Sequence, residues 1–333
     1  MTARSASSVL AAAAFFLPLA CPAADGDMAA SLSEQVGKVF NERASAVVRV
    51  ESSDRHGRLS GTGFFADPMG TIYTVYSTVG DAQDVTVVFA GERLPAKVLI
   101  ADARSGVALL KVERSTPFIP VASTRELRLA TPVISIGFPH DLDASPSFGI
   151  IGGFDRKYRD RFFVTTHLRA SVPVQAGFGG APLLNLSGEA VGMVIAGIDG
   201  GSSCFVLPIE AVDKIRHNFV RFGEARHGWV GVTVEELPGE PVKIAELGPQ
   251  TPAAKSGLRE GDVLIQVGEV PIKKVEDVLD ASYFLTDGDA VEVRVNRDGQ
   301  EMRFSVYSIT HPASEKPGLH AAGVPAEFIL QPK

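Results

Sequence analysis

The sequence predicts a large, mostly β domain followed by a smaller α+β module. Glycine is frequent, with 33 in 333 residues, against about 7% in an average protein, and this density is typical of a fold with many tight turns. Short β-branched and aromatic runs separated by glycine, proline or aspartate fill the first two thirds of the chain, which favours a β-sandwich or a pair of barrels. From His227 onwards strand and helix patterns alternate, which indicates the second module.

Composition excludes several classes of protein. The length suggests about two domains, and a hydrophobic content of 45% is too high for a disordered chain. The 39 acidic residues exceed the 32 basic ones, giving a net charge of −7. A chain of this charge lacks the basic surface that nucleic-acid binding requires, so we expect no nucleic-acid partner.

The first residues are typical of a targeting segment. A basic start at Arg4 precedes an uncharged run over 9–21, and small residues follow at Ala23 and Ala24. This pattern predicts a secretory signal peptide over 1–24, because the run is shorter than the ~20 residues of a membrane span. The mature chain is then expected to be secreted across the inner membrane, to a periplasmic or extracellular location, without a membrane span. Lipid attachment at Cys21 is the alternative.

Removal of the signal peptide would leave Cys204 as the only cysteine of the chain. An intramolecular disulfide is then excluded, which a domain with a large core tolerates in an oxidising compartment. Because Cys204 stands inside an apolar run, we interpret it as a small buried hydrophobic residue and not as a nucleophile.

The first domain is expected to begin and end with a helix. Leu32, Val36, Val39 and Phe40 recur at helical spacing and predict a helix over 32–43. A closing helix is expected over 209–222. The strand candidates between them are 47–50, 63–65, 71–75, 85–89, 97–100, 108–112, 133–136, 162–165 and 190–194.

The second module has its own start and stop signals. Thr251, Pro252 and Gly257 predict a one-turn helix, with a threonine cap, a proline at the first position and a glycine after the end. Apolar residues at alternate positions on both sides of the turn at 297–299 predict a hairpin. A strand is expected over 262–267 and a helix over 275–285. The last residues, 311–333, have no periodicity and are interpreted as a flexible tail.

Ordered motifs along the chain resemble those of the HtrA/Deg family of serine proteases. The segments that carry the resemblance are 61–65, 70–74, 108–112, 136–139, 177–185, 205–209 and 251–258. Each is weak alone, but the ordered set is specific and spans most of the chain. The resemblance implies a mostly β, chymotrypsin-like fold of two six-stranded β-barrels over 32–222. It also implies an α+β PDZ domain over 227–310.

The same resemblance locates three positions that normally carry the catalytic triad. The histidine of the family motif falls on Ser77, the aspartate on Gly106 and the serine of Gly-Asn-Ser-Gly-Gly-Pro on Gly179. None of these residues can act as general base, carboxylate or nucleophile respectively. The N–H groups of Gly177 and Gly179 could still form an oxyanion hole, worth about 10³–10⁴ over water without a triad. The sequence therefore predicts a pseudoprotease, with no catalytic residue.

A displaced catalytic constellation is the alternative. None of the seven histidines stands in a recognised base motif, and we interpret each as a surface or loop residue. The pairings considered are Ser147 or Ser171 with His167, or a serine–lysine dyad. The sequence carries no HExxH motif, Cys/His cluster or phosphate-binding loop, so neither a metal nor another cofactor is expected.

The PDZ resemblance implies a peptide-binding groove. PDZ domains bind C-terminal peptides by strand addition, with backbone N–H groups holding the carboxylate. The residues that match this cradle and the helix wall opposite it are Trp229, Val230, Gly231, Val232, Val275, Val278 and Leu279. A purely structural role in the core is the alternative for each of them.

Three functional hypotheses follow. The first is an exported, inactive HtrA-like protein that binds peptides or protein C-termini as an adaptor, a chaperone-like binder or a regulator in envelope quality control. The second is a serine endopeptidase with a displaced nucleophile. The third is a purely structural part of an oligomer, since the resemblance also implies homotrimers or association with an active protease.

Overall fold

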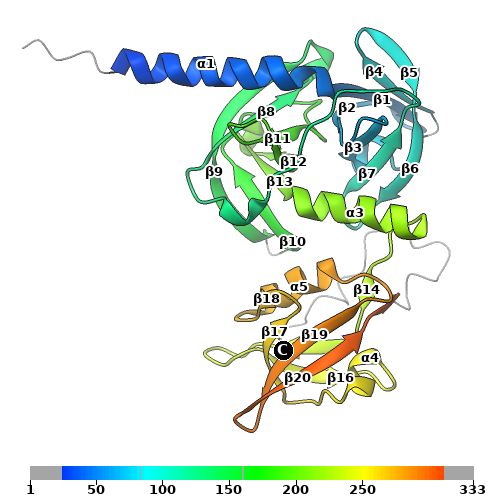
Figure 1. The fold of residues 1–333 in the computed structure, drawn as a ribbon, viewed down its shortest axis with the longest axis vertical. Coiled ribbons are helices and arrows are strands. Elements are labelled where there is room, and N and C mark those ends of the chain that lie inside the picture. Colours follow the sequence, from blue (N-terminus) through cyan, green and yellow to red (C-terminus); the bar gives the residue numbers. More distant parts are fainter. Residues whose placement is uncertain (1–24, 83, 160, 311–333) are drawn as a thin grey trace, which may run out of the picture.

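The computed structural model describes residues 25–82, 84–159 and 161–310. Two β domains lie side by side below a long helix, and a smaller α/β domain lies beneath them (Figure 1). The long helix, α1 (Asp25–Arg43), begins earlier than the predicted residue 32. The apolar periodicity covers only the C-terminal part of this helix, which packs on the β domains. Val39 in that part is 2% exposed, whereas residues 29–35 of the helix are exposed. The predicted signal peptide and tail lie outside the described residues.

The first β domain is one sheet of seven strands in the order β5-β4-β1-β2-β3-β7-β6. Valine and aromatic side chains from its inner face form a core of their own, which includes Val50, Phe65 and Leu110. The short helix α2 (Tyr76–Val79) follows β3 directly. The strands are Val47–Asp54 (β1), Gly57–Phe65 (β2), Thr71–Val75 (β3), Asp84–Phe89 (β4), Glu92–Pro95 (β5), Lys97–Asp102 (β6) and Val107–Lys111 (β7).

The second β domain is a closed six-stranded barrel in the order β10-β13-β12-β11-β8-β9. The sequence pattern misses its longest strand, β9, because Pro146 and glycines interrupt the apolar run. β9 forms because strands on both sides bind its backbone. The strands are Pro132–Gly137 (β8), Ser145–Tyr158 (β9), Arg161–Ala170 (β10), Pro182–Leu184 (β11), Ala190–Ile198 (β12) and Ser203–Pro208 (β13). Single 3-10 turns occupy Ala44–Ala46, Thr124–Glu126, Pro139–Asp141 and Asp199–Gly201.

The helix α3 (Ile209–Phe222) closes the second barrel at the predicted residues. Its apolar face packs into a core between the two β domains, together with Val39 of α1 and Leu109 of β7. This core also includes Tyr283 from the α/β domain, which is completely buried. The chain is therefore mostly β in the protease-type arrangement that the motifs imply.

The α/β domain contains a five-strand path, β15-β16-β17-β19-β20, with β18 added to β17. The Thr251 hydroxyl caps α4 by accepting a hydrogen bond from the Ala254 N–H (3.3 Å), as predicted. The elements are Gly228–Trp229 (β14), Val232–Glu235 (β15), Lys243–Leu247 (β16), Pro252–Ser256 (α4), Val263–Val267 (β17), Val270–Pro271 (β18), Val275–Phe284 (α5), Ala290–Arg297 (β19), Gln300–Tyr307 (β20) and Ile309–Thr310 (β21).

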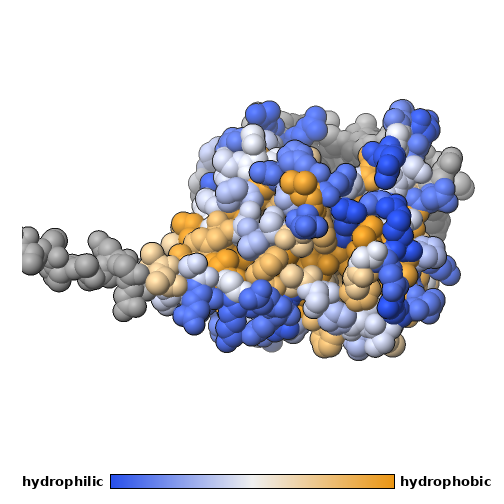
Figure 2. All heavy atoms as spheres, turned by 90° about the horizontal axis from the view of Figure 1, so that it is seen from above, coloured by the Kyte–Doolittle hydropathy of each residue, from blue (hydrophilic) through white to orange (hydrophobic). Residues whose placement is uncertain are grey.

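Apolar side chains are also present at the surface. Seen from above, they form a band across the end of the molecule from which α1 projects (Figure 2). No helix in residues 25–310, as far as these are described, has the length and hydropathy that crossing a bilayer would demand.

We expect the Tyr283→Phe variant to loosen the contact between the α/β domain and the β domains. The Tyr283 hydroxyl donates a hydrogen bond to the Ala211 carbonyl (2.9 Å) in a buried site, and such a bond contributes about 1 kcal/mol. Urea unfolding should give a loss of about that size. Tyr307→Phe, the same change at a residue that is 66% exposed, is the control and should change the free energy of unfolding by less than about 0.5 kcal/mol.

Candidate functional site: a vestigial cleft and a peptide groove

The loop that should carry the nucleophile is held against strand β2 by Thr62. The Thr62 N–H donates to the carbonyl of Gly179 (2.8 Å), and the Thr62 hydroxyl donates to the carbonyl of Gly177 (2.6 Å). Two glycines of the loop are enforced by these contacts. Gly177 and Gly180 both have positive φ, and a Cβ would lie 2.2 Å from the Phe138 oxygen at 177 and 2.0 Å from the Thr62 oxygen at 180.

Gly179 itself is under no such constraint. It is not among the residues with positive φ, and among the described residues a Cβ there would meet only the Val75 Cγ2 atom, at 3.3 Å. A small side chain therefore fits with a shift of a few tenths of an ångström. The loop therefore does not require a glycine at position 179, where the nucleophile is predicted.

The other two predicted triad positions, Ser77 and Gly106, lie near each other. The Tyr76 N–H, at the start of α2, donates to the carbonyl of Gly106 (2.8 Å). This bond brings Ser77, the next residue of α2, beside the turn that contains Gly106. Gly106 has φ +76, and a Cβ added there would have Ile195 Cγ2, at 4.0 Å, as its nearest described neighbour. Apolar methyl groups of Val75 and Ile195 thus face the positions of the serine and the aspartate.

Neither His167 nor Ser147, one of the serines considered with it, forms the predicted displaced pair. His167 is 6% exposed, its Nδ1 contacts the Thr165 carbonyl (2.8 Å), and it stacks on Phe163. The Ser147 hydroxyl donates instead to the Pro173 carbonyl (2.7 Å). Across 25–82, 84–159 and 161–310, no serine or threonine hydroxyl is hydrogen-bonded to a histidine ring.

One histidine differs from the sequence interpretation. His167 and His227 were both expected at the surface or in loops, and His227 does lie in a loop, although its side chain is only 11% exposed. The expectation is wrong for His167, which is a buried residue of strand β10 because its ring stacks on Phe163, a contact that local spacing does not reveal. Burial lowers the pKa of both imidazoles. Cys204 is buried as expected, and burial raises the pKa of its thiol to about 12.

A cleft of about 730 Å³ is lined in part by Gly179, the predicted nucleophile position. Its walls are the segments 174–179 and 194–201, with His140, Tyr158 and Arg159 at the rim. His140 adopts φ 49 and donates its N–H to the Ala176 carbonyl (2.7 Å). In the part of the chain that the structure describes, no hydrogen bond uses the N–H of Gly177 or Gly179 as donor. Both groups of the predicted oxyanion hole are therefore open to an acceptor.

The residues predicted to bind a peptide come from the segment around strand β15 and from helix α5. Among the described strands β15 pairs only with β16 and is an edge of its sheet. Gly231, in the cradle before β15, has φ +79, and a Cβ there would lie 2.4 Å from Thr251 Cβ and 2.9 Å from Trp229 Cη2. Only glycine fits at this position. Trp229 is also part of β14, where it pairs with Ile309.

Both walls of the groove also contact the domain core. Val230, Val232, Val275 and Val278 are partly buried against it. Leu279 is half-buried and is not part of that core. The structure therefore brings the predicted cradle and helix residues to one region, as the PDZ resemblance implies.

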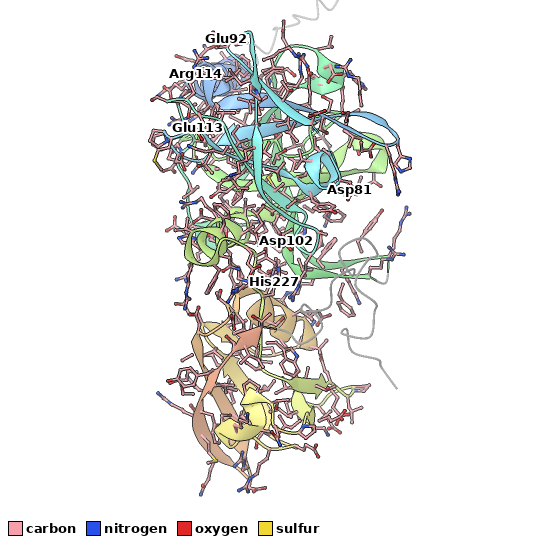
Figure 3. The ribbon with its side chains drawn as sticks, turned by 90° about the vertical axis from the view of Figure 1, so that its right-hand side faces the viewer. Asp81, Glu92, Asp102, Glu113, Arg114 and His227 are labelled. Carbon is pink, nitrogen blue, oxygen red and sulfur yellow. The ribbon has the colours of Figure 1, made fainter. Side chains whose placement is uncertain are left out.

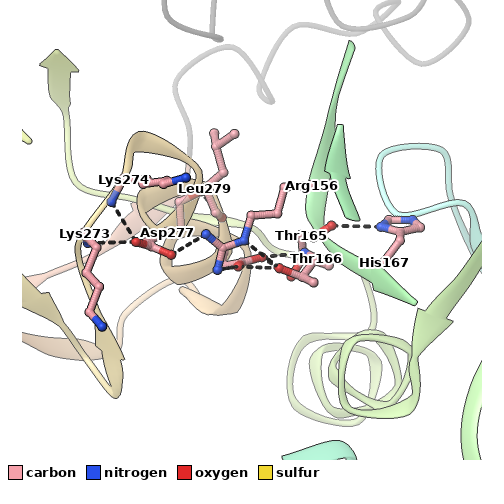
Figure 4. A network of polar contacts seen from close by, with 10 residues as sticks. Arg156, Thr165, Thr166, His167, Lys273, Lys274, Asp277 and Leu279 are labelled. Atoms are coloured by element: carbon pink, nitrogen blue, oxygen red, sulfur yellow. Dashed lines mark hydrogen bonds and ion pairs between the residues drawn. The ribbon is translucent and has the colours of Figure 1, made fainter. Parts of the chain in front are cut away.

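Helix α5 is held on the second barrel by a polar network that sequence reasoning misses (Figure 4). Arg156 of β9 pairs with Asp277 and with Asp280, the latter at 3.2 Å. Asp280 also accepts hydrogen bonds from the hydroxyls of Thr165 (2.9 Å) and Thr166 (2.6 Å) of β10. Because these partners are more than 100 residues apart, only the tertiary fold reveals them. Helix α5, which the sequence predicts as a wall of a peptide groove, thus also joins the two parts of the structure.

The arrangement defines a class of protein: a trypsin-like peptidase fold joined to one PDZ domain. Residues 61–193 match the family model for a trypsin-like peptidase domain, and residues 228–307 match that for a PDZ domain. The particular family is HtrA/Deg: this chain belongs to it, because it carries both domains in this order and its curated relatives are DegP-like proteins.

The curated relatives are longer than this chain. A probable periplasmic serine endoprotease DegP-like from Pseudomonas fluorescens is 28% identical over 83% of this chain and 62% of its own length. The protein of the same name from Ectopseudomonas mendocina is 30% identical over 81% of this chain and 60% of its own length. The chain thus spans about 60% of the relatives it matches.

Solved structures share the fold. The HtrA-type protease AlgW with tripeptide superposes with a TM-score of 0.70 at 19% identity, covering 83% of this chain and 97% of that chain. The serine endoprotease from Yersinia pestis gives 0.63 at 24% identity, covering 83% and 98%.

We expect adjacent glycines of the nucleophile loop to respond differently to alanine. Gly180→Ala should lower the free energy of unfolding by at least about 2 kcal/mol, because it combines positive φ with a backbone clash at 2.0 Å. Gly179→Ala is the matched control and should cost less than about 1 kcal/mol. Thermal and urea unfolding measure both, and equal losses would contradict the assigned geometry.

Proposed function

We propose that this chain is an exported HtrA-like protein that binds peptides or protein C-termini through its PDZ domain and does not cleave them. The observation that carries the proposal is the chemistry of the triad positions. Ser77, Gly106 and Gly179 supply no base, carboxylate or nucleophile. Their nearest neighbours, Val75 and Ile195, are aliphatic.

The retained scaffold supports binding as the remaining activity. The cleft, its open N–H groups and the enforced glycines at 177 and 180 persist without the catalytic side chains. Without a triad, an oxyanion hole and binding alone give about 10³–10⁴ over water. That is too little for useful peptide hydrolysis, so the protein is expected to act as an adaptor, a chaperone-like binder or a regulator of an active protease.

The PDZ domain supports the choice of ligand. Strand β15 offers an edge that is free among the described strands, which an extended peptide can join as an additional strand. At its start, Gly231 lets the cradle backbone turn close to Thr251, so backbone N–H groups can converge on a terminal carboxylate. Side-chain pockets along α5 would then select the last residues of the peptide.

The location is part of the proposal. The curated relatives are named as periplasmic, and the first residues match a secretory signal peptide. We therefore place the mature chain in the periplasm, where unfolded envelope proteins would supply exposed C-termini.

Purified protein is expected to leave casein intact and to take up no fluorophosphonate at serine. The reason is that no hydroxyl is activated by an imidazole in the described residues. Gel assay and mass spectrometry of the labelled chain provide the readout, with an active HtrA protease as positive control. Stoichiometric labelling of one serine, lost on its replacement by alanine, would instead support the displaced-nucleophile endopeptidase.

Peptide binding should be visible in the fluorescence of Trp229, the only tryptophan. A library of peptides with free C-termini should contain micromolar ligands, and amidation of the terminus should abolish their binding. Gly231→Ala should weaken binding at least tenfold, because a Cβ cannot fit beside Thr251.

Gly239→Ala is the matched control for this experiment. Gly239 also has positive φ, at +81, but no described atom lies within 4 Å of a Cβ there, and it is outside the cradle. Binding should be unchanged. If no peptide binds the wild-type chain, the structural-oligomer hypothesis takes precedence over the binding one.

A further inference from the structure

The joint between the β domains and the PDZ domain contains a buried histidine–aspartate pair. His227, in the segment that links α3 to β14, lies beside Asp102 at the end of β6 (Figure 3). His227 Nε2 is 3.2 Å from Asp102 Oδ1, and the two side chains are 11% and 10% exposed. Because Asp102 also accepts a hydrogen bond from the Ser105 N–H (3.1 Å), its carboxylate is the acceptor and Nε2 carries the hydrogen.

The second ring nitrogen of His227 has no partner among the described residues. Nδ1 is buried without a hydrogen bond there, and so is the Nζ of Lys214 on α3. The Lys214 ammonium faces the ring of Tyr283 on α5 at 5.0 Å. The positive charge of Arg104, in the turn after β6, disfavours a second positive charge on both His227 and Lys214. A proton added to Nδ1 would therefore create a buried cation that Asp102 pairs only at Nε2. Its Nδ1–H would have no acceptor among the described residues, and the charges of Arg104 and Lys214 oppose it.

We propose that this joint is an acid-sensitive latch, in which protonation of His227 releases the PDZ domain from the β domains. In the closed joint, neutral His227 bridges the linker to β6. Once the joint opens, water solvates the imidazolium and the Lys214 ammonium, which removes the cost of burying unpaired charges. The latch does not require peptide binding and is independent of the proposed function.

The direction of the pH response follows from the titratable groups at the joint. Burial lowers the pKa of His227 below its usual 6.5, although Asp102 opposes this. Burial, with Arg104 nearby, lowers the pKa of Lys214 to about 8, opposed by Asp102 and Asp289. Both groups bind protons more readily when exposed, so the closed joint loses stability as pH falls below their exposed pKa values.

Asp102 acts in the same direction at lower pH. Burial would raise its pKa, but hydrogen bonds from His227 and Ser105 outweigh this and lower it to about 2. Its contribution to the closed joint is therefore present above its ordinary value of 3.8 and is lost only as pH falls further. Between pH 7.5 and 5.5 the change is dominated by His227, because Lys214 takes up its proton between 10.5 and about 8 and is protonated in both the closed and the open joint below that range.

Small-angle X-ray scattering of the full mature chain tests the latch. We expect the radius of gyration to rise reversibly between pH 7.5 and pH 5.5, with opening increasing by up to about tenfold per pH unit for one proton. His227→Gln should remove most of this response, because glutamine can still donate to Asp102 but cannot titrate. His217→Gln is the control, since His217 lies on α3 with its side chain 70% exposed, and it should respond like the wild type.

A radius of gyration that is constant with pH in the wild type would overturn the proposal. So would an unchanged response in His227→Gln, or its loss in His167→Gln, which removes the other buried histidine of the interface. If His227→Gln does not fold, the proposal is tested on the wild-type chain alone. The His227 imidazole resonance must then titrate below pH 6.5 and together with the change in scattering.

Discussion

The architecture of the site depends on one buried threonine. Thr62 is completely buried, and each of its polar groups binds a different part of the site. Its N–H and hydroxyl hold two carbonyls of the loop 177–180, its hydroxyl accepts the Phe138 N–H, and its carbonyl accepts the Thr74 hydroxyl. The residue therefore fixes the loop of the second barrel to two strands of the first sheet. Its carbonyl also lies where a side chain at position 180 would project, so scaffold and loop constrain each other.

The contacts of Thr62 constrain the backbone of the loop 177–180, but they do not constrain the side chain that catalysis would need at position 179. Glycine is required at 177 and 180 because a Cβ would clash with the carbonyl oxygen of Phe138 or of Thr62, respectively. At position 179, between them, no such clash requires a glycine. A fold selected for its shape could thus keep the cleft and its N–H groups while the nucleophile disappeared. Gly106 differs, because its positive φ shows that the turn before β7 also has a backbone suited to glycine.

The contact between the domains is as polar as it is apolar. Tyr283 inserts into the core of the β domains, while Arg156 and two carboxylates of α5 join the helix to β9 and β10. The same helix forms a wall of the peptide groove. Buried polar groups that are satisfied add specificity to an interface, whereas unsatisfied ones make it sensitive to conditions. Within the described residues the joint contains both kinds, with the Asp280 network satisfied and the Lys214 ammonium not.

Local patterns in the sequence determine most of the secondary structure and the degenerate positions. Periodicity, caps and turn residues suffice for α3, for α4 and for the β19–β20 hairpin, where Asp298 and Gly299 take positive φ. They also assign the predicted triad positions to Ser77, Gly106 and Gly179, because the motifs around these residues keep their order and spacing. Local patterns fail for β9, whose hydrogen-bond partners are two other strands. Only the tertiary structure decided that His227 is buried against Asp102 and that α5 docks on the second barrel. The burial and charge of a side chain depend on residues far away in the chain, and no local spacing contains that information.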